Sequence, residues 1–267
     1  MQAPAQIAAT YVTVGTNKAK LPAAKMFVLA VFAGIFIAIA GASAAVASAT
    51  ISDPSTARLL NALIFPGGLV MVVLAGSELF TGNSLLLIPL LEKKIRIHEL
   101  LRSWIVVYLG NLCGSLFVAF LFVYSHTAGL FDGQLAQSLV NTAVAKTSLS
   151  FSDAFLRGIL CNILVCIAVW ITIGASTAAG KVFGLYLPIV VFVLAGYEHC
   201  VANMFYIPAG IFSVAEYGLT AEGLSWASFF LRNLLPVTFG NILGGFLVGG
   251  GYWFAYLHQT SHKKVHP

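Results

Sequence analysis

Two short polar stretches interrupt apolar segments of the chain, and they repeat each other 120 positions apart. The first reads G-S-E-L-F-T-G-N from Gly76, and the second reads G-Y-E-H-C-V-A-N from Gly196. A glycine, a glutamate and an asparagine recur at matching positions: Gly76, Glu78 and Asn83 in the first, and Gly196, Glu198 and Asn203 in the second. Ionisable side chains at membrane depth are rare and mark substrate paths, and their duplication indicates a path built from two related halves.

Thr81 and His199 have no polar counterpart in the other stretch, because they align with Val201 and Leu79. An imidazole can present a fixed hydrogen-bond donor or exchange a proton near neutral pH. A lone buried histidine is also often a satisfied core residue, and that alternative stays open. If the two stretches face one another, we expect Thr81 and His199 to meet near the centre as a polar pair.

The four duplicated polar side chains, Glu78, Asn83, Glu198 and Asn203, are expected to be structural. A stretch unwound at membrane depth exposes backbone groups that other protein groups must satisfy. We expect both glutamates to accept backbone N–H bonds at the start of the half-helix that follows. Ion binding by these carboxylates is the weaker alternative.

Five further residues could line or close such a path. Phe65, Leu69 and Phe192 precede the polar stretches at helical spacing and could form apolar constrictions, although core packing explains the same spacing. Asn162 lies deep in an apolar segment and could line the path or bind a loop backbone. Lys146 would attract anions if it lay beside a pore mouth, and is otherwise a solvated lysine.

The composition predicts an integral membrane protein with a single all-α domain. Of 267 residues, 59% are hydrophobic and 9% are charged, far from the soluble range. Six segments are long enough to span a bilayer as helices. They run over residues 26–50, 59–91, 99–124, 154–179, 184–213 and 228–257, and the overlong second and fifth contain the polar stretches.

The net charge of +5 is a topology signal, because ten of the fourteen basic residues fall on one side of these spans. The positive-inside rule then places both termini in the cytoplasm. Residues 1–20 are expected to form a weakly amphipathic cytoplasmic helix at the interface, and residues 258–267 a cytoplasmic tail.

A second repeat relates the third and sixth spans, in which G-N-x-x-G begins at Gly110 and at Gly240. The first and fourth spans share only an early glycine, Gly34 and Gly158. We therefore predict two three-helix repeats, 21–124 and 153–257, joined by a loop over 125–152. Three crossings are an odd number, so the repeats are inverted, with broken helices in positions two and five.

Cofactor and metal sites are not predicted. The cysteines lack ligand spacing, and no nucleophile with a base or cluster of carboxylates accompanies His199, which disfavours an enzyme. The cysteines are Cys113, Cys161, Cys166 and Cys200.

Several motifs together resemble the formate/nitrite transporter family, over residues 20–257. They are L-F-T-G-N from Leu79, G-Y-E-H-C-V-A-N-M from Gly196, A-K-T from Ala145, C-N-I-L-V-C from Cys161 and the two G-N-x-x-G motifs. The resemblance implies an aquaporin-like protomer of a homopentamer in the plasma (inner) membrane of a prokaryote, each protomer having its own pore for a small monovalent anion. It also implies that Thr81 and His199 form the central polar pair, that Phe65, Leu69 and Phe192 form constrictions, and that Asn162 and Lys146 line the path.

The expected function is therefore a channel or transporter for anions of weak acids, with formate first and nitrite or hydrosulfide as alternatives. In this hypothesis Lys146 attracts the anion, and His199, helped by Thr81, supplies a hydrogen bond or a proton before the permeant crosses the apolar rings. A facilitator of neutral solutes is a different class that remains open. The stretches lack the Asn-Pro-Ala signature of aquaporins, which disfavours a water or glycerol channel.

Overall fold

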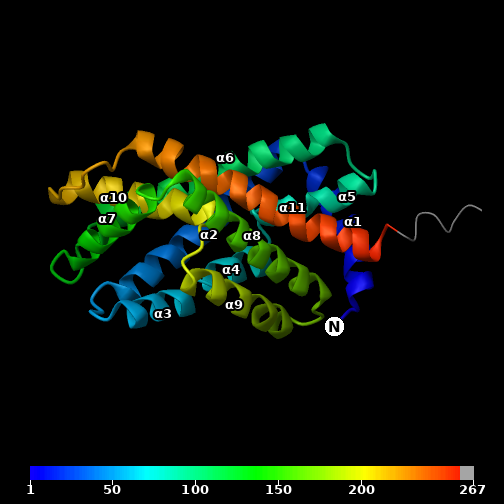
Figure 1. The fold of residues 1–267 in the computed structure, drawn as a ribbon, viewed down its shortest axis with the longest axis horizontal. Coiled ribbons are helices and arrows are strands. Elements are labelled where there is room, and N and C mark those ends of the chain that lie inside the picture. The colour runs from blue at the N-terminus through cyan, green and yellow to red at the C-terminus, as the bar shows by residue number, and fades with distance from the viewer. Residues whose placement is uncertain (259–267) are drawn as a thin grey trace, which may run out of the picture.

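The computed structural model describes residues 1–258, and this part of the chain is entirely helical. Its long helices run side by side as a bundle, with α6 (Ile97–Tyr124) and α11 (Leu235–Tyr256) along one face in Figure 1. Within these residues, five segments are long and apolar enough to cross a membrane. They are Ala23–Ser48 (α2), Pro54–Ala75, Ile97–Tyr124, Phe151–Gly174 (α8) and Ser228–Tyr256.

The second and fifth predicted spans are broken at the polar stretches, as expected. In the first half, α3 (Pro54–Ile64) is followed by α4 (Gly67–Ala75), and α4 ends at Gly76, whose φ is 80°. After the polar stretch the chain continues as a short 3₁₀-helix (Gly82–Leu86) and α5 (Leu87–Leu91). α9 (Ala178–Leu194) leads to Gly196, with φ of 73°, and α10 begins at Cys200 and ends at Tyr217. Glycine adopts this left-handed conformation without the steric penalty that other residues incur.

The two halves are related by a pseudo-two-fold axis that passes between α6 and α11. Tyr108 and Thr238 are equivalent at the 130-residue offset of these helices, and their hydroxyl groups hydrogen-bond to each other at 2.9 Å. A residue that contacts its own equivalent lies on the axis of a two-fold arrangement.

Close packing between α2 and α6, and between α8 and α11, depends on the glycines of the G-N-x-x-G motifs. A Cβ atom added at Gly114 would overlap the carbonyl of Val31, and one added at Gly244 would overlap that of Ile159. These faces therefore meet within one chain, with backbone against backbone. The same contacts show which residues of the first and fourth spans are equivalent, since Gly110 meets Ala30 where Gly240 meets Gly158. Equivalent residues of these two spans are therefore 128 positions apart. The predicted correspondence of Gly34 with Gly158 was wrong.

Two segments outside the predicted spans have more structure than the sequence indicated. The expected connecting loop contains the helix α7 (Gln134–Thr147), which ends beside Lys146. The expected interfacial helix is α1 (Pro4–Ala19), which is docked on the protein through fully buried Ile7 and Tyr11. Each half therefore begins with a short helix that packs against the bundle.

Both ends of the described chain lie on the same face of the molecule, at the right of Figure 1. The indole Nε1 of Trp253, near the end of α11, donates to a carboxylate oxygen of Glu92 after α5 at 2.8 Å. Leu257 packs in the same cluster as Ile7 of α1. The predicted tail from 259 onward, with Lys263 and Lys264, lies outside the described residues.

Candidate functional site

Thr81 and His199 meet in the centre of the molecule, as the sequence predicted. The Thr81 hydroxyl and Nε2 of His199 lie 2.9 Å apart, and both side chains are buried. Thr81 belongs to the first break and His199 to the second, so this hydrogen bond joins the two breaks across 118 positions of sequence.

The hydrogen bonds of His199 define its tautomer. Its Nδ1 accepts the backbone N–H of Ala202 at 3.1 Å, so His199 is the N-cap of α10. A ring nitrogen that accepts a hydrogen bond carries no proton, and the single proton of the neutral ring is then assigned to Nε2. Nε2–H donates to Thr81, and the Thr81 hydroxyl proton is left for another acceptor.

Two cavities lie at opposite ends of the α3–α4 and α9 segments. The Lys146 cavity, of about 490 Å³, is lined by Lys146, Phe65, Phe192 and His199 among others. The Lys18 cavity, of about 530 Å³, is lined by Lys18 and Leu69 among others.

A thin apolar partition separates the two cavities. Phe65 lines one cavity and Leu69, four residues later in the chain, lines the other. Phe65 and Phe192 contact edge to face with ring centroids 5.8 Å apart, and Phe192 stacks on the imidazole of His199 at 5.8 Å. Phe192 therefore links the Phe65 ring to His199, while Leu69 lines the cavity on the other side.

The duplicated glutamates bind lysines rather than backbone N–H groups, so the expected capping role was wrong. Glu78 accepts from Nζ of Lys18 at 2.9 Å, and Glu198 accepts from Nζ of Lys146 at 2.9 Å. The glutamate side chains are 6% and 5% exposed, which makes an unpaired carboxylate there unfavourable. Lysines at the ends of α1 and α7 supply the compensating charge.

Each ion pair is extended by an asparagine. Asn83 Nδ2 donates to Glu78 and to the Ser103 hydroxyl, while its Oδ1 accepts from Lys18. In the second half, Asn203 Nδ2 donates to Glu198 and to Asn233, at the position equivalent to Ser103. In the sequence, Lys18 is one of the basic residues that indicate topology, and the signal for its pairing role is its place 128 residues before Lys146.

The breaks themselves are held by the asparagines of the G-N-x-x-G motifs, for which the sequence predicts no such role. Asn111 accepts from the N–H of Phe80 at 2.9 Å and donates to the carbonyl of Glu78 at 2.9 Å. Asn241 accepts from the N–H of Cys200 and donates to the carbonyl of Glu198, both at 2.9 Å. The α10 N-terminus is thus capped by His199 and Asn241.

Asn162 supports the first break and lines neither cavity. Its amide donates to the carbonyl of Thr81 at 3.2 Å, and also to the carbonyl of Asn241. Of the two alternatives that the sequence left open, the structure shows the contact with loop backbone. Thr81 is thereby fixed at its backbone, while its hydroxyl faces His199.

Within residues 1–258, no group of three or more metal-ligating side chains is present. The site therefore consists of a hydrogen-bonding pair inside an apolar partition, with a lysine in the cavity on either side. This arrangement can offer an anion hydrogen bonds at the partition, while the charge of each lysine is balanced by its glutamate. In the tautomer assigned above, Nε2 of His199 donates to the Thr81 hydroxyl, so it is not placed to accept the hydroxyl proton as a base.

The chain matches known transport proteins over almost its whole length. The sequence model of the Formate/nitrite transporter family matches residues 5–254. A probable formate transporter of Methanothermobacter thermautotrophicus is 37% identical, over 97% of this chain and 98% of that protein. The formate channel FocA of Escherichia coli K12 is 36% identical, over 97% of this chain and 96% of FocA.

A solved structure described as a pentameric formate channel with formate bound superimposes with a TM-score of 0.78. It is 39% identical, and the match covers 88% of this chain and 98% of that one. The helix breaks, the duplicated polar residues and these matches lead to one conclusion. The chain belongs to the formate/nitrite transporter family, and it is a multi-pass membrane transport protein rather than an enzyme.

Proposed function

We propose that this protein is a channel for small monovalent anions of weak acids, with formate as its principal substrate. The observation that carries the proposal is the buried Thr81–His199 pair, which lies at an apolar partition between two lysine-containing cavities. The names of the relatives, probable formate transporter and formate channel, support formate as the substrate. By analogy with the solved pentameric channel, the protein assembles as a homopentamer with one path per protomer.

The proposed orientation has the Lys18 cavity facing the cytoplasm of a prokaryote and the Lys146 cavity facing outward across the inner membrane. In the sequence, ten of the fourteen basic residues are assigned to the same side of the predicted spans as Lys18, as the positive-inside rule requires. Both termini are then cytoplasmic.

The proposed mechanism uses the neutral His199 as a hydrogen-bond donor. An anion that leaves water for an apolar partition loses hydration, and fixed donors at that point replace part of it. The Thr81 hydroxyl proton is one such donor, and the Nε2–H of His199 becomes a second when the anion displaces the Thr81 oxygen from it. The N-cap bond from Ala202 to Nδ1 holds the ring in place. Protonation of Nδ1 would require the loss of this cap, which favours hydrogen bonding over proton donation by His199.

The test is labelled-formate flux in liposomes that contain the purified H199N variant. Asparagine is a strong N-cap, so its Oδ1 can replace Nδ1 toward Ala202 while the Nε2–H donor is lost. We expect flux to fall about tenfold, the effect of losing one hydrogen bond to a charged group, with an unchanged pH profile. A flux equal to that of the native protein would contradict the donor role.

The alternative role, proton transfer by His199, predicts a different result in the same assay. H199N would then lose the pH dependence of flux as well as its magnitude. Under the donor role, T81V should reduce flux as H199N does, because valine keeps the shape of threonine and removes the hydroxyl. T81S keeps the hydroxyl and should retain flux.

Nitrite and hydrosulfide are the alternative permeants, and competition among the three anions in the liposome assay ranks them. A facilitator of neutral solutes is the alternative of a different class. Flux of glycerol or urea that is insensitive to formate would favour it and contradict the anion proposal.

A further inference from the structure

The two breaks are flanked by equivalent residues of opposite character, Leu29 and Arg157. The carbonyl of Leu29 accepts the N–H of Glu78, and the carbonyl of Arg157 accepts the N–H of Glu198, both at 3.3 Å. Leu29 lines the Lys18 cavity and Arg157 lines the Lys146 cavity. The pseudo-symmetry therefore fails at one position beside the path, where one half has a leucine and the other a cation.

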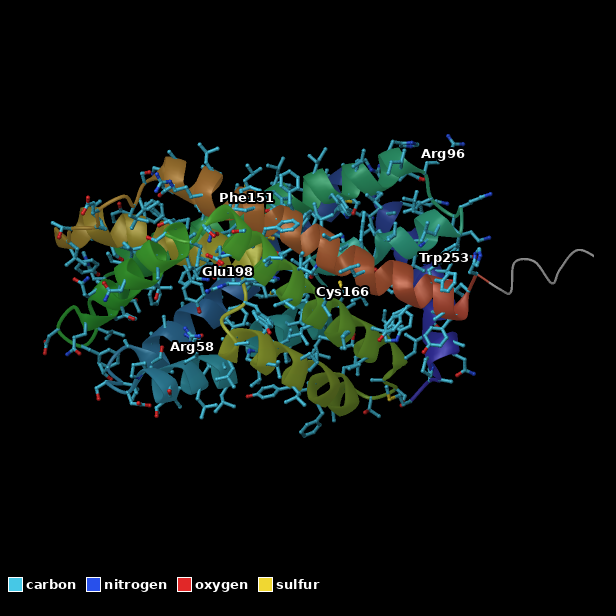
Figure 2. All side chains as sticks on the ribbon, in the orientation of Figure 1. Arg58, Arg96, Phe151, Cys166, Glu198 and Trp253 are labelled. Atoms are coloured by element: carbon cyan, nitrogen blue, oxygen red, sulfur yellow. The ribbon has the colours of Figure 1, made fainter. Side chains whose placement is uncertain are left out.

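A second arginine lies in the same cavity, against the second break. A Cβ atom added at Gly196 would lie 2.8 Å from Nη1 of Arg58, so this guanidinium rests on the glycine. The equivalent glycine, Gly76, has no atom within 4 Å of the same position. Figure 2 shows Arg58 on α3, close to the chain segment that carries Glu198. The guanidinium is thus placed at the break rather than at the outer rim.

Both arginines are free to bind a ligand. Lys146 is committed to Glu198, but no side-chain hydrogen bond or ion pair of Arg58 or Arg157 occurs within residues 1–258. In the Lys18 cavity, Lys18 is committed to Glu78, and the other lining cation is Lys181. The two cavities therefore differ in uncommitted positive charge, and only the Lys146 cavity has guanidinium groups.

We propose that Arg58 and Arg157 form an anion-binding site in the Lys146 cavity, selective for planar anions with two oxygens, such as carboxylates or nitrite. A guanidinium presents parallel N–H donors that match two oxygens, which hydrosulfide lacks. The site gives the two mouths unequal affinities for the permeant. This inference rests on the proposed channel function and assigns a capture step to one face.

The test compares formate uptake by right-side-out and inside-out membrane vesicles from cells that produce the intact protein. R157L places the residue of the equivalent position, leucine, beside the second break. We expect R157L to raise the half-saturation concentration about fivefold in right-side-out vesicles only, the effect of one partly exposed charge pair. R58Q should act in the same direction, and R157K should give an intermediate value because it keeps the charge without the fork.

R232L is the matched control, because Arg232 is an exposed arginine of the same half that lines neither cavity. Equal shifts for R157L and R232L, or equal shifts in both vesicle orientations, would overturn the site. An equal loss of affinity for formate and for hydrosulfide in R157L would overturn its selectivity. Failure of the channel proposal has a separate signature, since native vesicles would then show no uptake above vesicles that lack the protein.

Discussion

Asn111 and Asn241 make the same pair of hydrogen bonds to opposite helix breaks. Each accepts an N–H two residues after a duplicated glutamate and donates to the carbonyl of that glutamate. Both side chains are fully buried. Each break is therefore fixed by a neighbouring span as well as by its own residues.

N241A is expected to destabilise the protein by about 3 kcal/mol, because it leaves the buried N–H of Cys200 and the carbonyl of Glu198 without partners. N111A should have a similar effect on the first break. The midpoint of unfolding in detergent measures both. The control is N141A on the exposed face of α7, which should differ little from the native protein. A native-like midpoint for N241A would show that the amide does not hold the break.

K146M should be more destabilising than the double variant K146M/E198Q. The single change leaves the carboxylate of Glu198, 5% exposed, with amide donors but no cation, at a cost of about 3 kcal/mol. The double change removes the charge and should restore most of the loss. The same unfolding assay measures the four members of this cycle. Additive losses would mean that the two side chains are not coupled.

G244A should lower stability by about 2 kcal/mol, because the new methyl group would overlap the backbone carbonyl of Ile159 and push α8 and α11 apart. G249A is the matched control on the same helix. Its methyl group would meet no atom closer than 3.6 Å, and alanine favours the helix. If G244A were as stable as G249A, the close backbone contact would not be a constraint on the fold.

The stabilisation that Asp53 gives to the N-terminus of α3 should be lost at acidic pH. Its carboxylate accepts the N–H of Thr56 at 2.7 Å as the N-cap. Hydrogen bonding from the Thr56 side chain, and then from this backbone N–H, lowers the pKa of Asp53 below its usual 3.8. A lowered folded-state pKa stabilises the protein above the unfolded pKa, and the contribution disappears as pH falls through the folded pKa. D53A should therefore unfold more easily at pH 6, with a difference that shrinks below about pH 4. D53N also lacks the titrating carboxylate, so its difference from the native protein should change by the same amount over the same pH range, and a difference that is constant with pH would contradict this origin.

The sequence by itself determined the helical membrane fold, the two breaks and the central contact. Apolar segments long enough to span a bilayer follow from composition, and glycines beside duplicated polar residues identify where two of them are interrupted. The asymmetry of Thr81 and His199 within an otherwise repeated pattern predicted their meeting, which the structure shows at 2.9 Å.

Only the tertiary structure decided which groups satisfy the buried charges and the broken backbone. Glu78 pairs with Lys18, 60 positions away, and the second break is fixed by Asn241, more than 40 positions away. Such partners are set by helix packing, and nothing in the local sequence of a break specifies them. Leu29 and Arg157 can likewise be read in the sequence, but the sequence does not show that they are equivalent positions. Their equivalence depends on how α2 packs along α6 and how α8 packs along α11. This packing follows from glycine-mediated backbone contacts, which exist only in the folded protein.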